Sequence, residues 1–380
     1  MTIHWCGTGL SAVPGLRRLI EAGRDVIVWN RTVEKAAVAV GDLTDRIRAF
    51  SPEALAAETR AGDVVVSMLP GDWHVPLAEM CIGKGAHFVS SSYISPEMRA
   101  LDERAKAAGV ALVNEVGLDP GIDHLMAHAL MADYRNSDAF DPANTHHFLS
   151  YCGGVPKIPN PFRYKFSWSP LGVLKALRSP SRSLKGGEVF DVARPWDAIS
   201  SYDAPLAQTE SFEVYPNRDS LPFMADYGFG EDWTTDTFVR GTLRLNGWAE
   251  AWGDVFSEIE ALEGAAGDAR LQQMSDQFWA ENAYDPGEPD RVILCVDLKA
   301  EREGVVLWHK TYAMDARGDA DGTAMARLVS VPVSLAVGAV LDGQIGAGVS
   351  AAPGDPALVS EWMNTVDGLA QHLVVVDHVA

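Results

Sequence analysis

A glycine-rich motif at the start of the chain has the composition and the setting of a dinucleotide-binding loop. Gly7, Gly9 and Ala12 form a GxGxxA pattern between an apolar segment, Thr2–Cys6, and the beginning of a helical pattern. In such a strand–turn–helix unit the first glycine permits a tight turn, and the second lets backbone N–H groups approach a pyrophosphate. The third small residue keeps the helix close to the strand. We therefore predict a nucleotide-binding loop that consists of Gly7, Gly9, Leu10, Ser11 and Ala12.

The segment Asn30-Arg31-Thr32, which ends the second expected strand, indicates which nucleotide binds. A cofactor with a free ribose 2′-hydroxyl usually meets an acidic residue at this position, and none is present. Arg31, together with Asn30 and Thr32, instead suits a 2′-phosphate, which favours NADP over NAD. The alternative is a surface arginine in front of a helix that is capped by Thr32.

Three further segments follow expected strands: Val65–Pro70, Ser90–Tyr93 and Glu115–His124. Ligands bind at the carboxyl ends of the strands in open parallel sheets, so these segments are candidates for ligand contacts. The candidates for contact with the cofactor are Leu69, Ser91 and Leu118. Asp119 has two interpretations, a ligand contact or the cap of a helix with Pro120 in its first turn.

His124 and His128 are four residues apart and therefore share one face of a helix, as two metal ligands would. No glutamate lies between them in a metal-binding pattern and no third ligand is evident, so packing histidines are the favoured interpretation. The four cysteines lie far apart and contain no CxxC pair, which disfavours disulfide and zinc frameworks. We expect no metal site.

The first 115 residues alternate between strand and helix patterns. The expected strands are Thr2–Cys6, Asp25–Trp29, Arg46–Phe50, Asp63–Met68, Ala86–Ser90 and Val110–Asn114. Ser51-Pro52-Glu53 and Ser95-Pro96-Glu97 each combine a cap, a first-turn proline and an acidic residue, which predicts that helices begin there. Six strands joined by right-handed crossovers predict an α/β fold with a Rossmann-type doubly wound parallel sheet.

After Tyr134 the pattern changes to that of a second α+β domain with a mainly antiparallel sheet. Its expected strands include Thr145–Cys152 and Thr237–Leu245, and Arg291–Glu301 with Gly304–Met314 predict a hairpin. Apolar helical patterns return at Thr323–Leu341 and near Ala357–Val374. The predicted domains are 1–122 for dinucleotide binding, 123–320 for substrate binding, and 321–380 as a C-terminal helical segment.

The composition is that of an ordinary globular protein and narrows the classes of partner. A formal net charge of −21 over 380 residues argues against nucleic acid and against an anionic membrane. The most apolar run, Leu328–Leu341, contains Pro332 and is expected to be too short to span a bilayer. The first strand begins at residue 2, which leaves no room for a targeting peptide, so we expect a cytoplasmic protein. Exposed aromatic residues in the second domain would suit a homodimer.

Several longer motifs give the chain a specific resemblance. Ser91–Met98 (SSYISPEM) is followed by Asn114–His124 (NEVGLDPGIDH). The second domain contains Ser150–Gly154 (SYCGG), Tyr164–Pro170 (YKFSWSP), Tyr215–Ser220 (YPNRDS) and Arg240–Arg244 (RGTLR). In this order, and over nearly the whole chain, the motifs resemble saccharopine reductase, the glutamate-forming saccharopine dehydrogenase family.

The resemblance implies a reversible NAD(P)-dependent oxidation of the secondary amine of saccharopine. The products are L-glutamate and 2-aminoadipate 6-semialdehyde, in lysine metabolism. The resemblance also implies that the late helices pack back on the dinucleotide-binding domain, and it agrees with NADP at Arg31. The family's substrate contacts carry over to Ser92, Tyr93, Asp119, Ser169, Arg218, Thr242, Leu243 and Arg244.

The chemistry of these side chains agrees with such a substrate, an amino acid with three carboxylates. Arg218 and Arg244 can bind carboxylates bidentately, although surface ion pairs are the alternative. Hydration of the imine that follows hydride transfer requires a general acid/base, for which Asp119 and Tyr93 are the candidates. Cys152 is a weaker candidate and is better interpreted as a small apolar group in the wall of the substrate pocket.

Two alternatives to this function remain open at this point. The same fold could oxidise another secondary amine, such as a carboxylated polyamine, which would prefer acidic pocket residues to Arg218 and Arg244. A non-catalytic NADP-sensing protein would bind the cofactor without turnover and would have degraded substrate motifs, whereas these motifs are intact.

Overall fold

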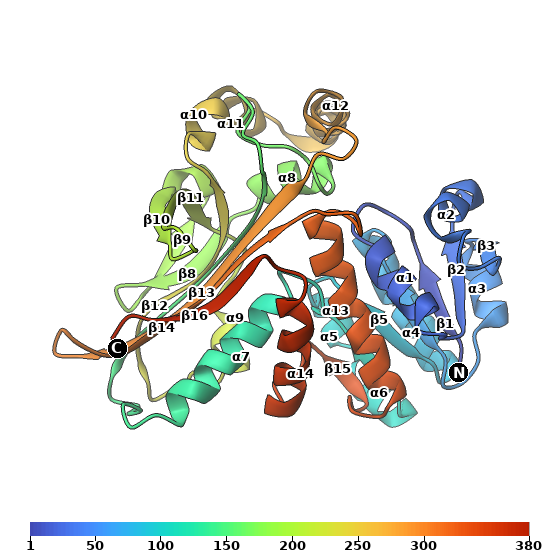
Figure 1. Cartoon of the computed structure of the whole chain (residues 1–380), viewed down its shortest axis with the longest axis horizontal. Helices are drawn as coiled ribbons and strands as arrows, with labels where there is room; N and C mark the ends of the chain where they lie inside the picture. Colours follow the sequence, from blue (N-terminus) through green and yellow to red (C-terminus); the bar gives the residue numbers. More distant parts are fainter. Residues whose placement is uncertain (380) are drawn as a thin grey trace. The chain divides into compact units, whose positions relative to one another are not determined.

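The computed structural model describes residues 1–379, which form two compact units (Figure 1). The first unit consists of Met1–Leu125 and Ala320–Val366, and the second consists of Met126–Asp319 and the residues from Asp367 onward. Each unit has its own β-sheet.

The sheet of the first unit is parallel throughout, and its neighbouring strands follow the order β15-β6-β5-β4-β1-β2-β3. The strands are β1 (Ile3–Cys6), β2 (Val26–Asn30), β3 (Ile47–Ala49), β4 (Val64–Ser67), β5 (His87–Ser90), β6 (Ala111–Val113) and β15 (Gly348–Ser350). The first six have the 3-2-1-4-5-6 order of a doubly wound dinucleotide-binding sheet, so the predicted fold class is confirmed. The late strand β15 was not among the expected strands.

Helices flank this sheet. They are α1 (Val13–Glu21), α2 (Val33–Val40), α3 (Pro52–Glu58), α4 (His74–Lys84), α5 (Pro96–Arg99), α6 (Asp102–Ala108), α13 (Ala324–Leu341) and α14 (Pro356–Asp367), with the short 3₁₀ turn η1 (Gly71–Trp73). The predicted caps are confirmed, because the hydroxyls of Ser51 and Ser95 accept hydrogen bonds from the backbone N–H groups at the starts of α3 and α5, each at 3.1 Å.

Helix α13 packs against α1 inside the first unit (Figure 1). Gly15 makes this close approach feasible, because a Cβ at this position would lie 1.9 Å from the carbonyl oxygen of Ser330. The Gly15 N–H donates to the Ser330 hydroxyl at 2.7 Å. By length and composition α13 could cross a membrane, contrary to the expectation from the shorter run Leu328–Leu341. However, 78% of its apolar window is buried within the protein, as in the core helix of a globular fold.

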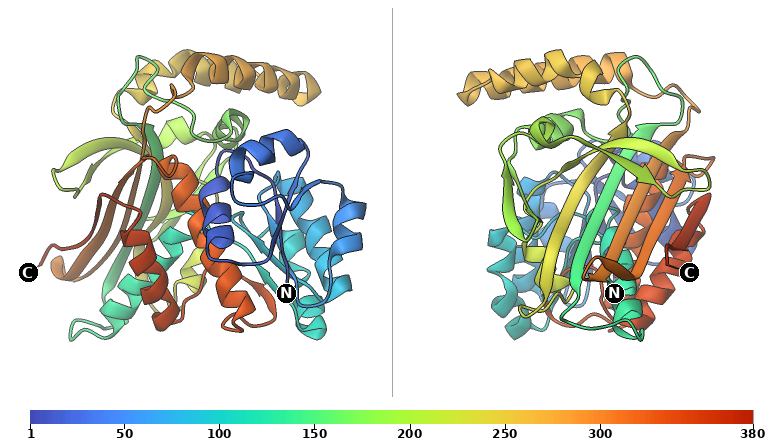
Figure 2. Two further views of the ribbon diagram at one scale, coloured as in Figure 1. Left: turned by 45° about the vertical axis from the view of Figure 1, so that its right-hand side comes forward. Right: turned by 90° about the vertical axis from the view of Figure 1, so that its left-hand side faces the viewer.

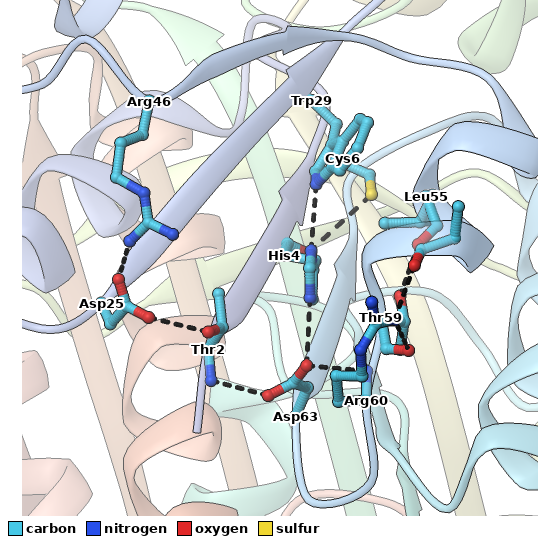
Figure 3. Close-up of polar contacts among 11 residues, drawn as sticks. Thr2, His4, Cys6, Asp25, Trp29, Arg46, Leu55, Thr59, Arg60 and Asp63 are labelled. Atoms are coloured by element: carbon cyan, nitrogen blue, oxygen red, sulfur yellow. Dashed lines mark hydrogen bonds and ion pairs between the residues drawn. The ribbon is translucent and has the colours of Figure 1, made fainter.

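A polar network connects the amino ends of β1 and β4 with Trp29 on β2 (Figure 3). The indole N–H of Trp29 donates to Nδ1 of His4 at 3.2 Å, so the ring proton of His4 lies on Nε2, which donates to Asp63 at 3.3 Å. Asp63 also accepts from the backbone N–H groups of Thr2, at 2.7 Å, and Arg60, at 2.8 Å. Burial lowers the pKa of His4. For Asp63 burial alone would raise the pKa, but the hydrogen bonds from Thr2, Arg60 and His4 outweigh burial and lower it.

The second unit contains a mixed sheet with the order β10-β11-β12-β7-β13-β14-β16. The strands are β7 (Thr145–Pro156), β10 (Ser200–Ala204), β11 (Glu210–Pro216), β12 (Thr234–Leu245), β13 (Asp290–Arg302), β14 (Val305–Arg317) and β16 (His372–Asp377), and a hairpin of β8 (Ser181–Lys185) and β9 (Glu188–Val192) pairs with β12. Strands β7 and β12 are parallel, and the other neighbours are antiparallel. The predicted β13–β14 hairpin is confirmed.

The end of the chain differs from the expected helix near Ala357–Val374. Helix α14 stops at Asp367, and His372–Asp377 form β16, which pairs with β14. The three consecutive valines of β16 explain the difference, because β-branched side chains favour a strand once a partner strand is available.

Helix α7 (Ile122–Arg135) leads the chain into the second unit, which also contains α8 (Pro170–Leu177), η2 (Pro195–Ala198), α9 (Pro222–Asp226), α10 (Trp248–Ala251), α11 (Gly253–Glu260) and α12 (Gly264–Asn282). The β-register assigns alternate residues to two faces of the sheet. One face carries Ser150, Cys152, Arg240, Thr242 and Arg244. The other face carries His147, Asp297, Lys299, His309 and Thr311. In the right-hand view of Figure 2, strands β7, β13 and β14 lie side by side with no helix in front of them.

Candidate active site

The glycine-rich loop after β1 has the backbone geometry that a pyrophosphate requires. Gly7 adopts φ +104°, and a Cβ there would lie 2.9 Å from the carbonyl oxygen of Met68, so only glycine fits. A Cβ at Gly9 would meet no atom within 4 Å, which leaves the loop open on this side. Among residues 1–379, the backbone N–H groups of Leu10 and Ser11 donate to no protein acceptor. Such N–H groups in front of a helix bind phosphate oxygens.

Arg31 follows this loop at the end of β2. Its side chain is exposed and makes no hydrogen bond or ion pair within the part of the chain that the structure describes. Asn30 connects the end of β2 to the glycine loop, because its Oδ1 accepts from the Thr8 N–H at 3.3 Å and its Nδ2 donates to the Thr32 carbonyl at 2.7 Å. Of the alternative interpretation, a surface arginine before a helix capped by Thr32, the cap is wrong because the Thr32 side chain forms no cap hydrogen bond, whereas Arg31 does lie at the surface. The guanidinium of Arg31 therefore fits a 2′-phosphate.

The other predicted cofactor residues lie at the carboxyl ends of neighbouring strands. Leu69 is half-buried next to the glycine loop, since a Cβ at Gly7 would lie 3.3 Å from Leu69 Cδ2. Ser91 follows β5 and lies beside Gly117, where a Cβ would be 2.9 Å from Ser91 Cβ. Leu118, the next residue, is buried. The structure thus brings these residues to the edge of the sheet where a dinucleotide binds.

Tyr93 and Asp119, the two predicted catalytic residues, form one hydrogen-bonded pair. The Tyr93 hydroxyl donates to Asp119 Oδ1 at 2.9 Å. The expectation that Asp119 caps a helix with Pro120 in its first turn is wrong. Helix α7 begins only at Ile122, and Asp119-Pro120 form the tip of a tight turn between bridged residues. Gly121, with φ +147°, holds the chain out of the helical conformation until that point.

His74 is a site residue that the sequence analysis missed. It lies at the start of α4, 6% exposed, with Nδ1 3.0 Å from the Ser67 hydroxyl and Nε2 2.8 Å from the hydroxyl of Ser92, a predicted substrate contact. Burial lowers the pKa of His74 to about 4, so the ring is neutral at neutral pH. No spacing in the sequence distinguishes this histidine, because Ser67 and Ser92 reach it from two different strand ends.

His124 and His128 have separate partners, although they lie on one helix. His124 is buried with Nε2 3.1 Å from Glu115 Oε2, and Glu115 Oε1 accepts from the Ile94 N–H at 2.8 Å. The Glu115 carboxylate therefore fixes the loop that carries Tyr93. His128 packs edge-on against the ring of Tyr227, with centroids 5.7 Å apart.

In the second unit, Arg244 is a buried cation in an aromatic setting. It is 6% exposed, and its guanidinium carbon lies 4.9 Å from the ring centroid of Tyr164, 5.5 Å from that of Trp248 and 5.7 Å from that of Tyr215. Its cross-strand partner, Glu213, instead accepts from two backbone N–H groups at the start of α10. Within residues 1–379, Arg244 forms no ion pair and its Nε lacks a hydrogen-bond partner. The surface ion pair considered above is therefore not realised for Arg244.

The neighbours of Arg244 on this face include Thr242, directly paired with Cys152 on β7. Cys152 is 8% exposed, as a small group in a pocket wall would be. Arg240, two positions before Thr242, lies on the same face with its guanidinium 3.9 Å from the ring of Phe223. The period-2 spacing of Arg240, Thr242 and Arg244 could have identified this further arginine.

The remaining predicted substrate contacts lie in other settings. Leu243 is fully buried in the apolar core of the opposite face, so only its backbone is available on the side of Arg244. Ser169 is exposed and caps α8, with its hydroxyl 3.2 Å from the Gly172 N–H. Arg218 is exposed in the loop after β11, at φ +58°. Of the two arginines predicted to bind carboxylates, Arg244 is therefore buried and Arg218 is exposed.

A doubly wound sheet with a glycine-rich loop after β1 and an exposed arginine after β2, followed by a second α+β unit, is the arrangement of an NADP-dependent oxidoreductase. Residues 6–113 match the family model of the saccharopine dehydrogenase NADP binding domain, and residues 117–369 match that of the saccharopine dehydrogenase C-terminal domain. The chain belongs to the saccharopine dehydrogenase family.

Named relatives agree with this assignment. The chain is 30% identical to saccharopine dehydrogenase [NADP(+), L-glutamate-forming] of Pyricularia oryzae, over 89% of this chain and 90% of the relative. It is 28% identical to the mitochondrial alpha-aminoadipic semialdehyde synthase of Bos taurus, of which it covers only 38%.

Two solved structures share the fold. The apo saccharopine dehydrogenase (L-Glu forming) of Saccharomyces cerevisiae superposes with a TM-score of 0.78 at 25% identity, covering 99% of both chains. The homospermidine synthase of Legionella pneumophila superposes with a TM-score of 0.65 at 11% identity, covering 99% of this chain and 91% of the other, which shows the fold alone. The predicted family, fold class, NADP cofactor and oxidoreductase class are confirmed.

Proposed function

We propose that this protein catalyses the L-glutamate-forming reaction of saccharopine dehydrogenase. Saccharopine, NADP⁺ and water give L-glutamate, 2-aminoadipate 6-semialdehyde, NADPH and a proton. The observation that carries the proposal is Arg244, a buried guanidinium that has no anionic partner among residues 1–379 in a protein of net charge −21. Such a group is costly to bury alone and is stabilised by a ligand carboxylate.

The first unit binds the cofactor, which accepts the hydride when it is bound. The N–H groups of Leu10 and Ser11 would bind the pyrophosphate of the cofactor, and Arg31 would hold its 2′-phosphate. Gly7 keeps the loop in the conformation that makes these contacts feasible. These residues orient the nicotinamide and leave the proton transfers to side chains of the protein.

Hydride loss from the carbon beside the secondary amine leaves an imine, to which water must add before the carbon–nitrogen bond breaks. The Tyr93–Asp119 pair is suited to this step. The Asp119 carboxylate accepts a proton from water, and the Tyr93 hydroxyl, which donates to Asp119, orients the carboxylate. Ser92 is held by neutral His74 and can hydrogen-bond a substrate carboxylate without adding charge.

In the second unit, Arg244 binds a carboxylate of saccharopine, and Thr242 lies on the same sheet face. The aromatic rings around Arg244 exclude water, which strengthens an arginine–carboxylate pair relative to an exposed pair. Arg218, exposed in its loop, is a second carboxylate ligand.

The test is NADPH formation, followed by absorbance, from saccharopine and NADP⁺, with NAD⁺ in parallel. Absence of both NADPH formation from NADP⁺ and NADH formation from NAD⁺ would exclude this function. Arg244→Met should raise KM for saccharopine about 10- to 100-fold, because a hydrogen bond to a charged group is worth about 1.5–3 kcal/mol. The KM for NADP⁺ should be unchanged. If Arg244→Met fails to fold, Arg244→Lys, which keeps the charge, takes its place. The matched control is Arg302→Met, at an exposed arginine of the same unit.

The alternative substrate, a polyamine with additional cationic nitrogens, predicts a different result. Arg244→Met would then leave the KM unchanged or lower it, because the substrate would no longer face a like charge.

A further inference from the structure

A pocket on the second unit lies on the sheet face opposite Arg240, Thr242 and Arg244. It encloses about 350 Å³ and is lined by side chains that include His147, Asp297, Lys299, His309, Thr311 and His378. These residues come from β7, β13, β14 and the segment after β16. The β-register places Arg240, Thr242 and Arg244 on the opposite face. The pocket is therefore separate from the arginines proposed to bind the substrate.

Three side chains in this pocket bring metal-ligating atoms together. One ligand atom each from Asp297, His309 and His378 lies within 4.8 Å of the other two. The Nε2 of His309 is 2.8 Å from Asp297 Oδ2, and the Nε2 of His378 is 2.8 Å from the hydroxyl of Thr311, which itself donates to the same carboxylate oxygen. Ligand atoms around a zinc ion at about 2.0–2.2 Å are about 3.3 Å apart, so small side-chain adjustments suffice.

The two imidazole rings are arranged so that both can bind one ion. They stack with centroids 4.1 Å apart and planes inclined by 26°. The backbone N–H of His378 donates to the backbone carbonyl of His309 at 3.0 Å, which holds the two residues side by side. Burial, followed by the neighbouring His309, lowers the pKa of His378, which favours the neutral ring that binds a metal.

The charges in the pocket also suit a cation. Lys299 donates to Glu301 at 2.8 Å, so its positive charge is balanced on its own strand. Asp297 lacks a lysine or arginine within ion-pair distance among the described residues. His147 lines the same pocket, but its Nε2 lies 3.5 Å from Glu301 Oε1, so this imidazole is directed to Glu301 and is not one of the three ligands.

We propose that Asp297, His309 and His378 bind one divalent transition-metal ion of the zinc type. Two imidazoles and a carboxylate suit this class of ion, and the fourth position is open to water or to a small anion in the pocket. The ion would cross-link β13, β14 and the segment after the edge strand β16. This proposal differs from the prediction of no metal site that was made from the sequence. It does not depend on the proposed dehydrogenase activity.

The experiment uses the full chain without an affinity tag, stripped of metal by a chelator. Co²⁺ is titrated into the protein and its binding is followed by visible absorption, and Zn²⁺ is then added to displace it. The affinity for Zn²⁺ alone is measured by calorimetry. We expect one ion per chain and visible absorption of four- or five-coordinate Co²⁺ that Zn²⁺ abolishes. Binding without such absorption, or with several equivalent ions per chain, would overturn the proposal.

Single variants assign the ligands. Asp297→Asn, His309→Gln and His378→Gln should each weaken Zn²⁺ binding at least tenfold. His372→Gln is the matched control, because His372 begins β16, the strand that precedes His378, and pairs opposite Asp315, away from the three ligands. His378 is exposed near the end of the chain, so this variant is expected to fold even if Asp297→Asn does not. Equal affinity in His378→Gln and the control would contradict the proposal.

Discussion

The buried imidazole of His74 predicts a specific loss of stability in acid. Its pKa is lowered to about 4 from the ordinary value of 6.5, chiefly by burial. The pKa in the folded state lies below that in the unfolded state, so between these two values the unfolded state binds more protons. The contribution to stability is therefore complete above about pH 6.5 and is lost as the pH falls toward 4.

The magnitude follows from the difference in pKa. About 2.5 pKa units correspond to roughly 3.4 kcal/mol between neutral pH and full protonation, at about 1.36 kcal/mol per unit. At about pH 5 most of the folded rings are still neutral, and the expected loss is about 2 kcal/mol. This is a substantial part of the 5–15 kcal/mol by which a typical protein is stable, as a rough range.

The measurement compares wild type with His74→Gln in urea unfolding at about pH 7.5 and about pH 5. Glutamine keeps a hydrogen-bonding group near Ser92 but does not titrate, so the variant should lose about 2 kcal/mol less between the two pH values. Burial also lowers the pKa of His4, His87 and His146, and these groups contribute equally to both proteins. The same pH dependence in wild type and His74→Gln would refute a neutral, buried His74. His372→Gln is the control.

Three further outcomes test the remaining structural arguments. Arg31→Ala should raise KM for NADP⁺ about 10- to 100-fold and leave KM for NAD⁺ unchanged, because only NADP⁺ carries the 2′-phosphate; a parallel rise for both nucleotides would contradict this role. Gly7→Ala should abolish NADP⁺ binding in calorimetry because its Cβ would lie 2.9 Å from the Met68 oxygen, whereas Gly23→Ala, at φ +72° with no atom within 4 Å, should retain binding. Asp63→Ala should destabilise the chain by about 1–3 kcal/mol in urea, since it leaves buried donors without an acceptor; an unchanged midpoint would show that water replaces the carboxylate.

Local patterns were sufficient to predict much of the nucleotide-binding unit. The GxGxxA spacing of Gly7, Gly9 and Ala12 lies within six residues, and Ser51 caps its helix through an atom three residues away. Such features depend on short stretches of chain, so the sequence alone specifies them. The late strand β16 was mistaken for helix, because its identity depends on the partner β14, far away in the sequence.

The site depends on contacts between distant segments, and these required the tertiary structure. The Tyr93–Asp119 pair joins residues 26 positions apart, and His74 meets Ser92 only because β4 and β5 are neighbours in the sheet. The aromatic surroundings of Arg244 are likewise assembled from separate elements.

The sequence by itself determined the class of fold, the cofactor and the family, because local turns, periodicity and ordered motifs carry that information. The tertiary structure decided which groups meet, which arginine is buried without an anionic partner among the described residues, and how Asp297, His309 and His378 converge. The physical reason is that strand order and register place residues side by side across the sheet, and neither can be read from the spacing of the residues along the chain.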